Sequence, residues 1–177
     1  IANSIYREVI PRVLSQGPQD SMPQIQPSWL NPDGCLNPDK LLAGFLDFWR
    51  RHGEPLLKSA PYHEIAPHLV LMAFLHRVVN GAGSLEREYA TGIGRMDICL
   101  RYGAVVMGIE LKVWRPKKPD PLKAGLAQLD QYLNGLNLKT GWLVIFDRRP
   151  DLPPIEDRTS ADEVLSPAGR RIAVIRG

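Results

Sequence analysis

The stretch GRMDICLRYGAVVMGIELKVWR, residues 94–115, decides the fold of this chain. Two apolar runs flank a Tyr-Gly pair, which predicts two β-strands joined by a tight turn. Asp97, Glu110 and Lys112 interrupt these runs. An explanation of these three charges is therefore also a hypothesis about what the protein does.

The segments around this hairpin predict an α/β fold. Apolar spacing is helical before the hairpin region and extended within it, so the hairpin and the run LEREYAT before it form a three-strand meander. We expect a mixed central sheet flanked by helices, with Gly53 and Pro55 ending the first helix. The expected helices lie within residues 41–52, 61–83 and 120–138, and the further strands at residues 85–91, 141–147 and 170–176.

Composition indicates one soluble globular domain. The chain has 177 residues, of which 44% are hydrophobic and 23% charged, and these values are ordinary for such a domain. Residues 1–40 are rich in proline and turn formers, so we expect an irregular N-terminal arm, which belongs to the end of a preceding region, followed by a domain at residues 41–177. No apolar run reaches the roughly 18 residues of a membrane helix and no signal-peptide pattern is present, which predicts a cytoplasmic protein.

Charge and cysteine content restrict the function only weakly. Cys35 and Cys99 are far apart and lack the paired spacing of a zinc site, so neither a disulfide framework nor a structural metal is indicated. The net charge of +3 is compatible with a polyanionic partner. It does not establish one.

Alternation along the hairpin predicts where its charges point. Glu110 and Gly108 share one face of their strand. If the turn centres on Tyr102 and Gly103, Asp97 lies opposite Gly108 and diagonal to Glu110, on the same face. A register shift of one residue would separate the two carboxylates.

Two convergent carboxylates predict a site for a hard divalent cation such as Mg²⁺. The backbone carbonyl of Leu111 could add a ligand, and Lys112 would place a positive charge beside a metal-bound water. That combination suits phosphodiester hydrolysis. The alternative is that Asp97, Glu110 and Lys112 lie on the solvated face of an amphipathic hairpin.

The order of four segments resembles the PD-(D/E)XK nuclease superfamily. Residues 62–149 are more closely similar to the nuclease-like domain at the C-terminus of certain prokaryotic AAA-type ATPases. The resemblance covers about half of the chain and implies a restriction-endonuclease-like core. The segments that carry it are MDICL, GIELKVWR, LAQLDQYL and GWLVIFDRR.

The resemblance also implies roles for individual residues. Asp97 matches the motif aspartate, and Glu110 and Lys112 match the E-x-K element. Glu64 matches an additional acidic residue beside the metal, and Gln128 a glutamine found in some branches. Asp97, Glu110, the Leu111 carbonyl and Glu64 would then hold Mg²⁺ or Mn²⁺. One departure is that Met96 stands where the name-giving proline would be.

The implied activity is metal-dependent hydrolysis of nucleic acid, with DNA favoured over RNA. The expected partners are nucleic acid and an AAA-type ATPase region in the same full-length chain, and a homodimer is open. Two alternatives remain: a non-cleaving domain that binds nucleic acid or a partner for the ATPase, and a purely structural module. The second would gain if Asp97 and Glu110 paired with arginines or faced solvent apart.

Several other features have less specific interpretations. His63 and His68 in HEIAPH are five residues apart and not four, so they do not match a zinc-protease helix and are read as core or surface histidines. Trp114 lies near enough to a basic loop to stack on a base. Weaker candidates for contacts to nucleic acid are the arginines at 148, 149, 170 and 171. The residues expected to contact nucleic acid are Arg115, Lys117, Lys118, Lys123 and Tyr132.

Overall fold

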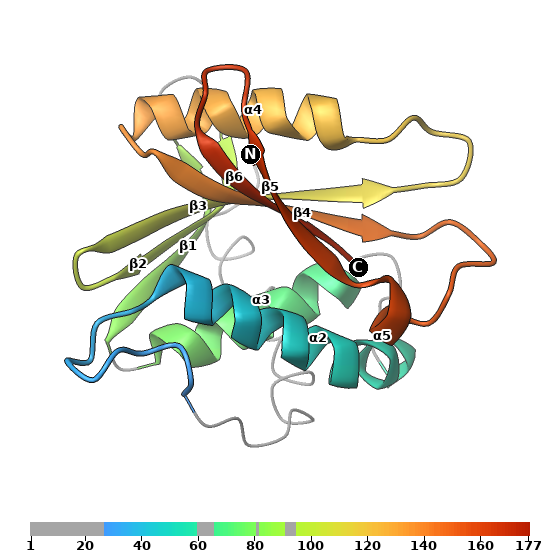
Figure 1. The fold of residues 1–177 in the computed structure, drawn as a ribbon, viewed down its shortest axis with the longest axis horizontal. Helices are drawn as coiled ribbons and strands as arrows, with labels where there is room; N and C mark the ends of the chain where they lie inside the picture. Colours follow the sequence, from blue (N-terminus) through green and yellow to red (C-terminus); the bar gives the residue numbers. More distant parts are fainter. Residues whose placement is uncertain (1–26, 60–65, 81, 91–94) are drawn as a thin grey trace, which may run out of the picture.

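Six β-strands form one mixed sheet in a computed structural model that describes residues 27–59, 66–80, 82–90 and 95–177 (Figure 1). Helix α4 covers one face of the sheet, and α2 and α3 cover the other. The elements in chain order are α2 (Pro38–Ser59), α3 (Ala66–Val79), β1 (Gly83–Ala90), β2 (Arg95–Tyr102), β3 (Val105–Trp114), α4 (Leu122–Gly135), β4 (Thr140–Asp147), α5 (Ile155–Arg158), β5 (Ser160–Leu165) and β6 (Arg171–Arg176). The predicted α/β class, with a mixed sheet flanked by helices, is confirmed.

The sheet has the strand order β1-β2-β3-β4-β6-β5. β1, β2 and β3 form the predicted antiparallel meander, and β3 pairs with β4 in parallel after the crossover through α4. β6 continues the parallel part beside β4, and β5 closes the edge antiparallel to β6. The strands β3, β4 and β6 therefore run in the same direction, and their carboxyl ends lie at the same end of the sheet.

The predicted register of the β2–β3 hairpin is wrong by two residues. Tyr102 pairs with Val105, so the turn consists of Gly103 and Ala104, and Gly108 faces Cys99 instead of Asp97. The φ of Gly103 is +56°, which suits the first position of a type II′ turn, where glycine is favoured. A shift of two changes which residues are opposed but not the face on which Glu110 and Lys112 are expected, because the strand repeat is two residues.

Helix α2 does not end at its predicted stop signals. Gly53 and Pro55 both lie inside it, and the helix continues to Ser59. Gly53 is buried, and a Cβ atom there would lie 3.2 Å from the Ile155 side chain of α5. Packing of α2 on α5 and the sheet thus outweighs the local cost of glycine and proline in a helix. Neither α5 nor β5 was predicted, because their residues were assigned to the proline-rich loop that leads to the last strand.

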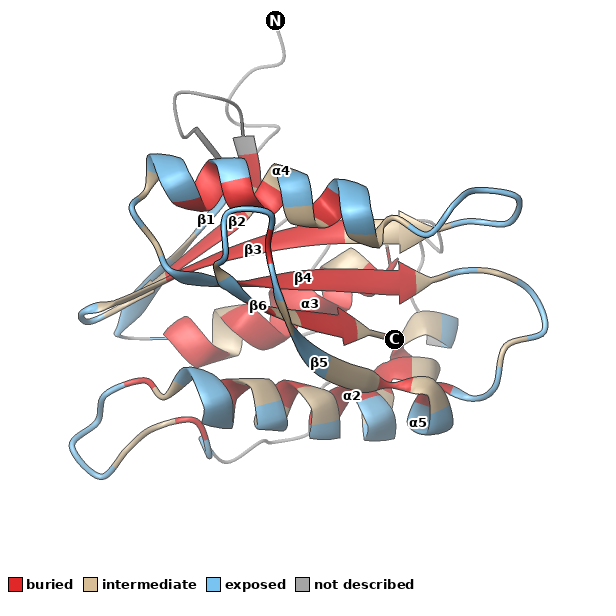
Figure 2. Ribbon diagram, turned by 45° about the horizontal axis from the view of Figure 1, so that its top comes forward, coloured by how far each residue is buried: buried red, intermediate tan, exposed pale blue. Residues whose placement is uncertain are grey.

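Two apolar layers hold the sheet between its helices. The larger contains Phe45 and Trp49 of α2 and Phe74 of α3, and the smaller contains Leu129 and Leu133 of α4. Figure 2 shows β4 buried along most of its length between these layers. None of the described helices is long and apolar enough to cross a membrane.

The segment before α2 contributes to the larger layer. Trp29 and Leu36 are each 3% exposed there, and a β-bridge joins Leu30 to Leu36. The rest of the predicted arm, residues 1–26, lies outside the described residues.

Candidate active site

Strand β3 delivers two charged residues toward helix α4. Ile109 and Leu111 pack in the layer under α2 and α3. Glu110 and Lys112 alternate with them and so point to the other face, where Lys112 reaches Gln128 of α4. The backbone period of two residues is thus enough to bring the E-x-K pair to one side of the sheet.

Glu110 is a completely buried carboxylate, with 0% of the residue exposed. Its Oε1 atom accepts a hydrogen bond of 2.7 Å from Lys112 Nζ, whereas Oε2 has no hydrogen-bond partner in the described part of the chain. Burial raises the pKa of Glu110 to about 7, against the opposing effect of Lys112, and the nearby charge of Asp97 raises it further. Asp97 is near by position, because its Oδ2 atom accepts a hydrogen bond from the N–H of Leu111, the residue after Glu110.

Lys112 is held by a chain of hydrogen bonds that runs onto α4. Its Nζ atom donates to Gln128 Oε1 at 2.8 Å, and Gln128 Nε2 donates to the hydroxyl oxygen of Tyr132 at 2.9 Å. Gln128 and Tyr132 are four residues apart and so are neighbours on the helix surface. Tyr132, expected to contact nucleic acid, is only 8% exposed, and in this position it supports Gln128.

Asp97 lies where β2 separates from β3. The last paired residues of the hairpin are Ile98 and Ile109, and Asp97 Oδ2 accepts a 2.8 Å hydrogen bond from the backbone N–H of Leu111. The side chain of Asp97 thus takes the place of a backbone carbonyl at the end of the ladder. Continuing the register would put Asp97 directly opposite Glu110, where the sequence predicted a diagonal neighbour.

The alternation of side chains along β2 is interrupted beside Asp97. In a regular strand, residues three apart point to opposite faces. Met96 and Cys99 nevertheless both pack in the layer under α4, while Ile98 packs in the other layer. Asp97, between Met96 and Ile98, is half-buried and belongs to neither apolar layer.

His68, interpreted from the sequence as a core or surface histidine, is half-buried on the face of the sheet opposite α4. It lies on α3, with its ring 5.7 Å from that of Phe146 of β4. Its Nε2 atom is buried with no hydrogen-bond partner among the described residues. Burial lowers the pKa of His68, and the charges of Asp97 and Lys112 act on it in opposite directions.

The comparison with a zinc-protease helix in the sequence analysis paired His68 with His63, and the resemblance assigned an acidic role to Glu64. Both Glu64 and His63 lie outside the described residues.

The acidic groups of the site form an incomplete metal-binding set within the described ranges. Those ranges contain no group of three or more His, Cys, Asp or Glu side chains that could hold a metal ion. They do contain two of the predicted acidic ligands, Asp97 and Glu110, each with one carboxylate oxygen that has no hydrogen bond to a described residue.

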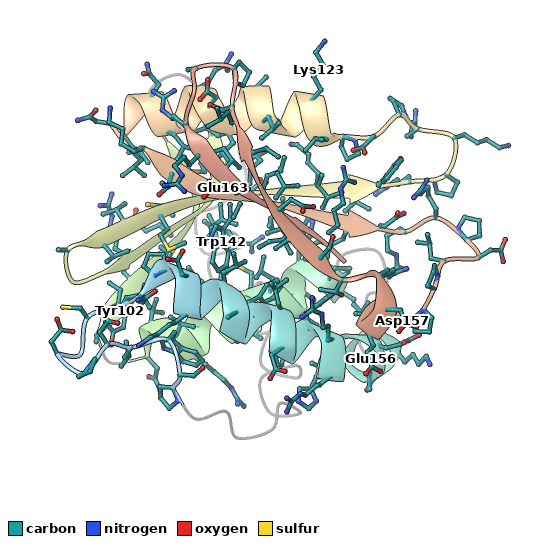
Figure 3. The ribbon with its side chains drawn as sticks, in the orientation of Figure 1. Tyr102, Lys123, Trp142, Glu156, Asp157 and Glu163 are labelled. Atoms are coloured by element: carbon teal, nitrogen blue, oxygen red, sulfur yellow. The ribbon has the colours of Figure 1, made fainter. Side chains whose placement is uncertain are left out.

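The basic residues after β3 are exposed as expected. Arg115, Lys117 and Lys118 lie in the loop that leads to α4, where the N–H of Lys118 donates to the carbonyl of Arg115. Lys117 has a φ of +61°, a conformation in which a lysine is uncommon. Lys123, in the first turn of α4, points away from the protein (Figure 3).

Three of the weaker arginine candidates are neutralised by carboxylates. Arg149 pairs with Asp147 and Arg171 with Glu163. Arg170 pairs with Asp130 on α4, which is 9% exposed. Arg148 is exposed and forms no ion pair with a described residue, so it is the one of the four whose charge is not compensated within the described chain.

Comparison with known proteins does not assign this site to a family. No model of a known protein family, no curated protein and no solved structure matches the chain.

Proposed function

We propose that this protein is a divalent-metal-dependent nuclease of the PD-(D/E)XK type that hydrolyses phosphodiester bonds, with DNA favoured over RNA as its substrate. The observation that carries this proposal is the set of short hydrogen bonds joining Glu110, Lys112 and Gln128, with Asp97 beside them at the end of the β2–β3 ladder. A buried carboxylate with a strongly raised pKa beside a second carboxylate and a lysine is typical of functional sites.

The donor set fits a hard divalent cation. A buried carboxylate oxygen without a partner, such as Glu110 Oε2, costs free energy unless something binds it. In this proposal Asp97, Glu110, the carbonyl of Leu111 and Glu64 hold Mg²⁺ or Mn²⁺. The bound ion would polarise a phosphate oxygen and lower the pKa of a water molecule.

Lys112 has the main role among the chain's own groups. Its ammonium group lies beside Glu110 and can donate hydrogen bonds to the attacking water or to a phosphate oxygen on which charge develops. Gln128 restrains Lys112, and Tyr132 restrains Gln128.

The competing interpretations from the sequence are less well supported. A solvated hairpin face does not agree with the complete burial of Glu110. A purely structural role would gain from arginine partners or from two carboxylates that face solvent apart. In the described part of the chain neither Asp97 nor Glu110 pairs with an arginine, and Glu110 is completely buried. An AAA-type ATPase region in the same full-length chain remains part of the proposal, as does the non-cleaving alternative.

Cleavage of end-labelled nucleic acids tests the proposal. Single-stranded, duplex and branched DNA and RNA are incubated with Mg²⁺, Mn²⁺ or EDTA and with wild type, Asp97→Asn, Lys112→Ala and the control Lys139→Ala. Lys139 is exposed and precedes β4. We expect metal-dependent cleavage by wild type and the control, and none by the two site variants. Binding without any cleavage by wild type would favour the non-cleaving alternative, and full activity of both site variants would refute the assignment.

A further inference from the structure

Trp114 lies next to the candidate active site on the same face of β3. It follows Lys112 by two residues, so the two side chains point to the same side, and their Cα atoms are about 7 Å apart in a strand. The indole packs against the layer under α4, and its Nε1 atom donates to the carbonyl of Lys118 at 3.0 Å. Trp114 therefore has a fixed orientation beside the residue proposed to contact the scissile phosphate.

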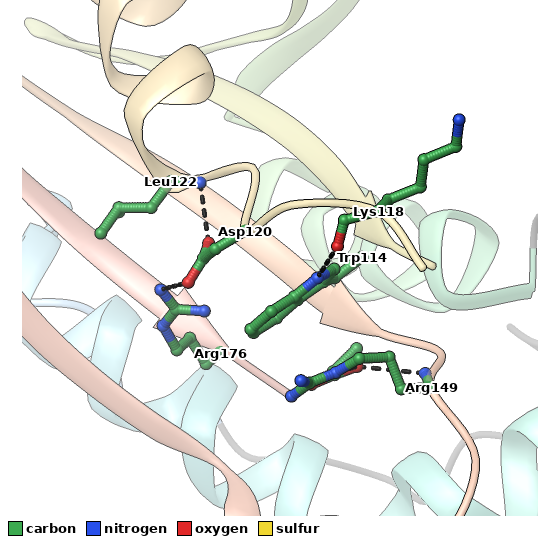
Figure 4. Close-up of polar contacts among 7 residues, drawn as sticks. Trp114, Lys118, Asp120, Leu122, Arg149 and Arg176 are labelled. Carbon is green, nitrogen blue, oxygen red and sulfur yellow. Dashed lines mark hydrogen bonds and ion pairs between the residues drawn. The ribbon is translucent and has the colours of Figure 1, made fainter. Parts of the chain in front are cut away.

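Arg149 covers the indole of Trp114 (Figure 4). The central carbon of its guanidinium lies 3.5 Å from the centre of the Trp114 ring. Asp147 holds this guanidinium through three contacts, of 3.0 Å and 3.1 Å to Nε and 2.6 Å to Nη2. Asp147 thus holds the guanidinium by its edge, while one face of the guanidinium lies on the indole.

This arrangement limits what Arg149 can do. Asp147 compensates its charge and occupies the donors at its edge, so an electrostatic contact with phosphate is weakened. The Arg149 side chain nevertheless remains 38% exposed. What remains for a ligand is chiefly the flat surface of the guanidinium, and flat guanidinium surfaces stack on nucleobases.

Uncompensated cations flank Arg149 and Trp114 along the chain. Arg148 precedes Arg149, and Arg115 and Lys117 follow Trp114; all three are exposed and form no ion pair with a described residue. The N–H of Arg148 donates to the carbonyl of Trp114, which holds the two loops side by side. These cations suit phosphate contacts, whereas Arg149, paired with Asp147, does not.

We propose that Arg149, stacked on Trp114, is a platform for one unpaired base next to the scissile phosphate. The substrate is then nucleic acid with a single-stranded stretch at the cleavage site, because a base inside a duplex is stacked between its neighbours and does not expose its face. This inference rests on the proposed function, since it uses the position of Lys112 to place the phosphate.

Binding of single-stranded oligonucleotides in EDTA tests the platform without cleavage. One set of oligonucleotides carries a single abasic position, moved along the strand. Wild type is compared with Arg149→Lys, which keeps a cation for Asp147 but loses the planar group, and with Arg148→Ala as the matched control. Trp114 fluorescence gives a direct readout, because the other three tryptophans are at most 3% exposed.

We expect wild type to bind at least about tenfold more weakly when one particular base is missing. Arg149→Lys should lose this discrimination and keep its salt dependence, whereas Arg148→Ala should keep the discrimination and show a smaller salt dependence. Retention of the discrimination by Arg149→Lys, its absence in wild type, or equal binding of duplex and single strands would overturn the inference. If metal-dependent cleavage still requires Lys112 in those cases, the proposed nuclease function stands.

Discussion

Two buried acid–base pairs on the α4 side of the sheet differ in how completely their carboxylates are satisfied. Asp130 accepts hydrogen bonds from Ser166 Oγ, the N–H of Ala168 and Arg170 Nη1. Glu110 accepts one from Lys112 and has an oxygen without a partner within the described residues. Both pairs lie on the face of the sheet that α4 covers. They differ in the number of hydrogen-bond donors that surround each carboxylate.

The pKa shifts of the two carboxylates have opposite signs. Burial acts to raise the pKa of Asp130, but the hydrogen bonds from Ser166 and Arg170 outweigh it, and the pKa is lowered. Burial raises the pKa of Glu110 to about 7, because Lys112 and the backbone of Asp97 do not compensate for the lost water and the charge of Asp97 raises the pKa further. The fully hydrogen-bonded pair of Asp130 and Arg170 fastens α4 to the β5–β6 turn. A buried carboxylate that lacks partners, such as Glu110, costs folding free energy and indicates a function.

The largest expected effect is on stability and comes from breaking the satisfied pair. Arg170→Ala leaves Asp130 buried without its cation and should lower the free energy of unfolding by about 3 kcal/mol. Urea unfolding followed by circular dichroism measures this. Arg171→Ala removes a cation from an exposed pair with Glu163 and should change stability little. Equal effects of the two substitutions would contradict the structural role given to Asp130.

The second prediction is that Glu110→Gln stabilises the metal-free protein at alkaline pH. The folded state holds the Glu110 proton with a pKa of about 7, against about 4.5 when unfolded, so wild-type stability should fall as pH rises through this window. Above it the loss amounts to about 3 kcal/mol, at 1.36 kcal/mol per pKa unit. Gln keeps an acceptor for Lys112 and should remove this loss.

Unfolding in EDTA at several pH values between 5 and 8.5 measures the effect. Wild type and Glu110→Gln should converge near pH 5 and separate toward pH 8. Asp130→Asn serves as the comparison of opposite sign, because the lowered pKa of Asp130 contributes stability that is lost only as pH falls below about 4. A wild-type pH profile that Glu110→Gln leaves unchanged would show that Glu110 does not carry this cost.

The third prediction is that metal affinity depends on pH and changes by about tenfold per pH unit below the pKa of Glu110. Because Glu110 must lose its proton to bind a cation, Mn²⁺ affinity should rise between pH 6 and 7 and level off above about pH 7.5. Calorimetry in buffers of different ionisation enthalpy should detect the released proton below pH 7. Asp97→Asn should weaken binding at every pH. Affinity that is independent of pH would separate Glu110 from the metal site.

The smallest expected effect comes from the end of the hydrogen-bond chain. Tyr132→Phe keeps the buried ring and removes the hydroxyl that accepts from Gln128. We expect a loss of stability of about 1 kcal/mol and a several-fold decrease in kcat with little change in KM, since Lys112 is only less well restrained. A kcat equal to that of wild type would limit the role of Tyr132 to packing.

Most of the sheet and the face of β3 that carries Glu110 and Lys112 could be predicted. The meander, α4, β4 and β6 follow from local periodicity, and so does the placement of Glu110 and Lys112 on one face. The two-residue error in register did not affect this placement, because the side-chain direction repeats every second residue. By contrast, α2 continues through Pro55 because contacts with distant segments outweigh the local signal.

The sequence by itself determined the class of fold and which residues carry the chemistry, since periodicity and residue type are local properties. The tertiary structure alone decided how deeply each charge is buried and what compensates it. Glu110 and Asp130 are both acidic residues in amphipathic segments, and nothing local distinguishes them. The same holds for Arg148 and Arg149, of which only the second stacks on Trp114. Burial and pairing depend on segments that are far apart in the chain, and they set the free-energy cost of each charge.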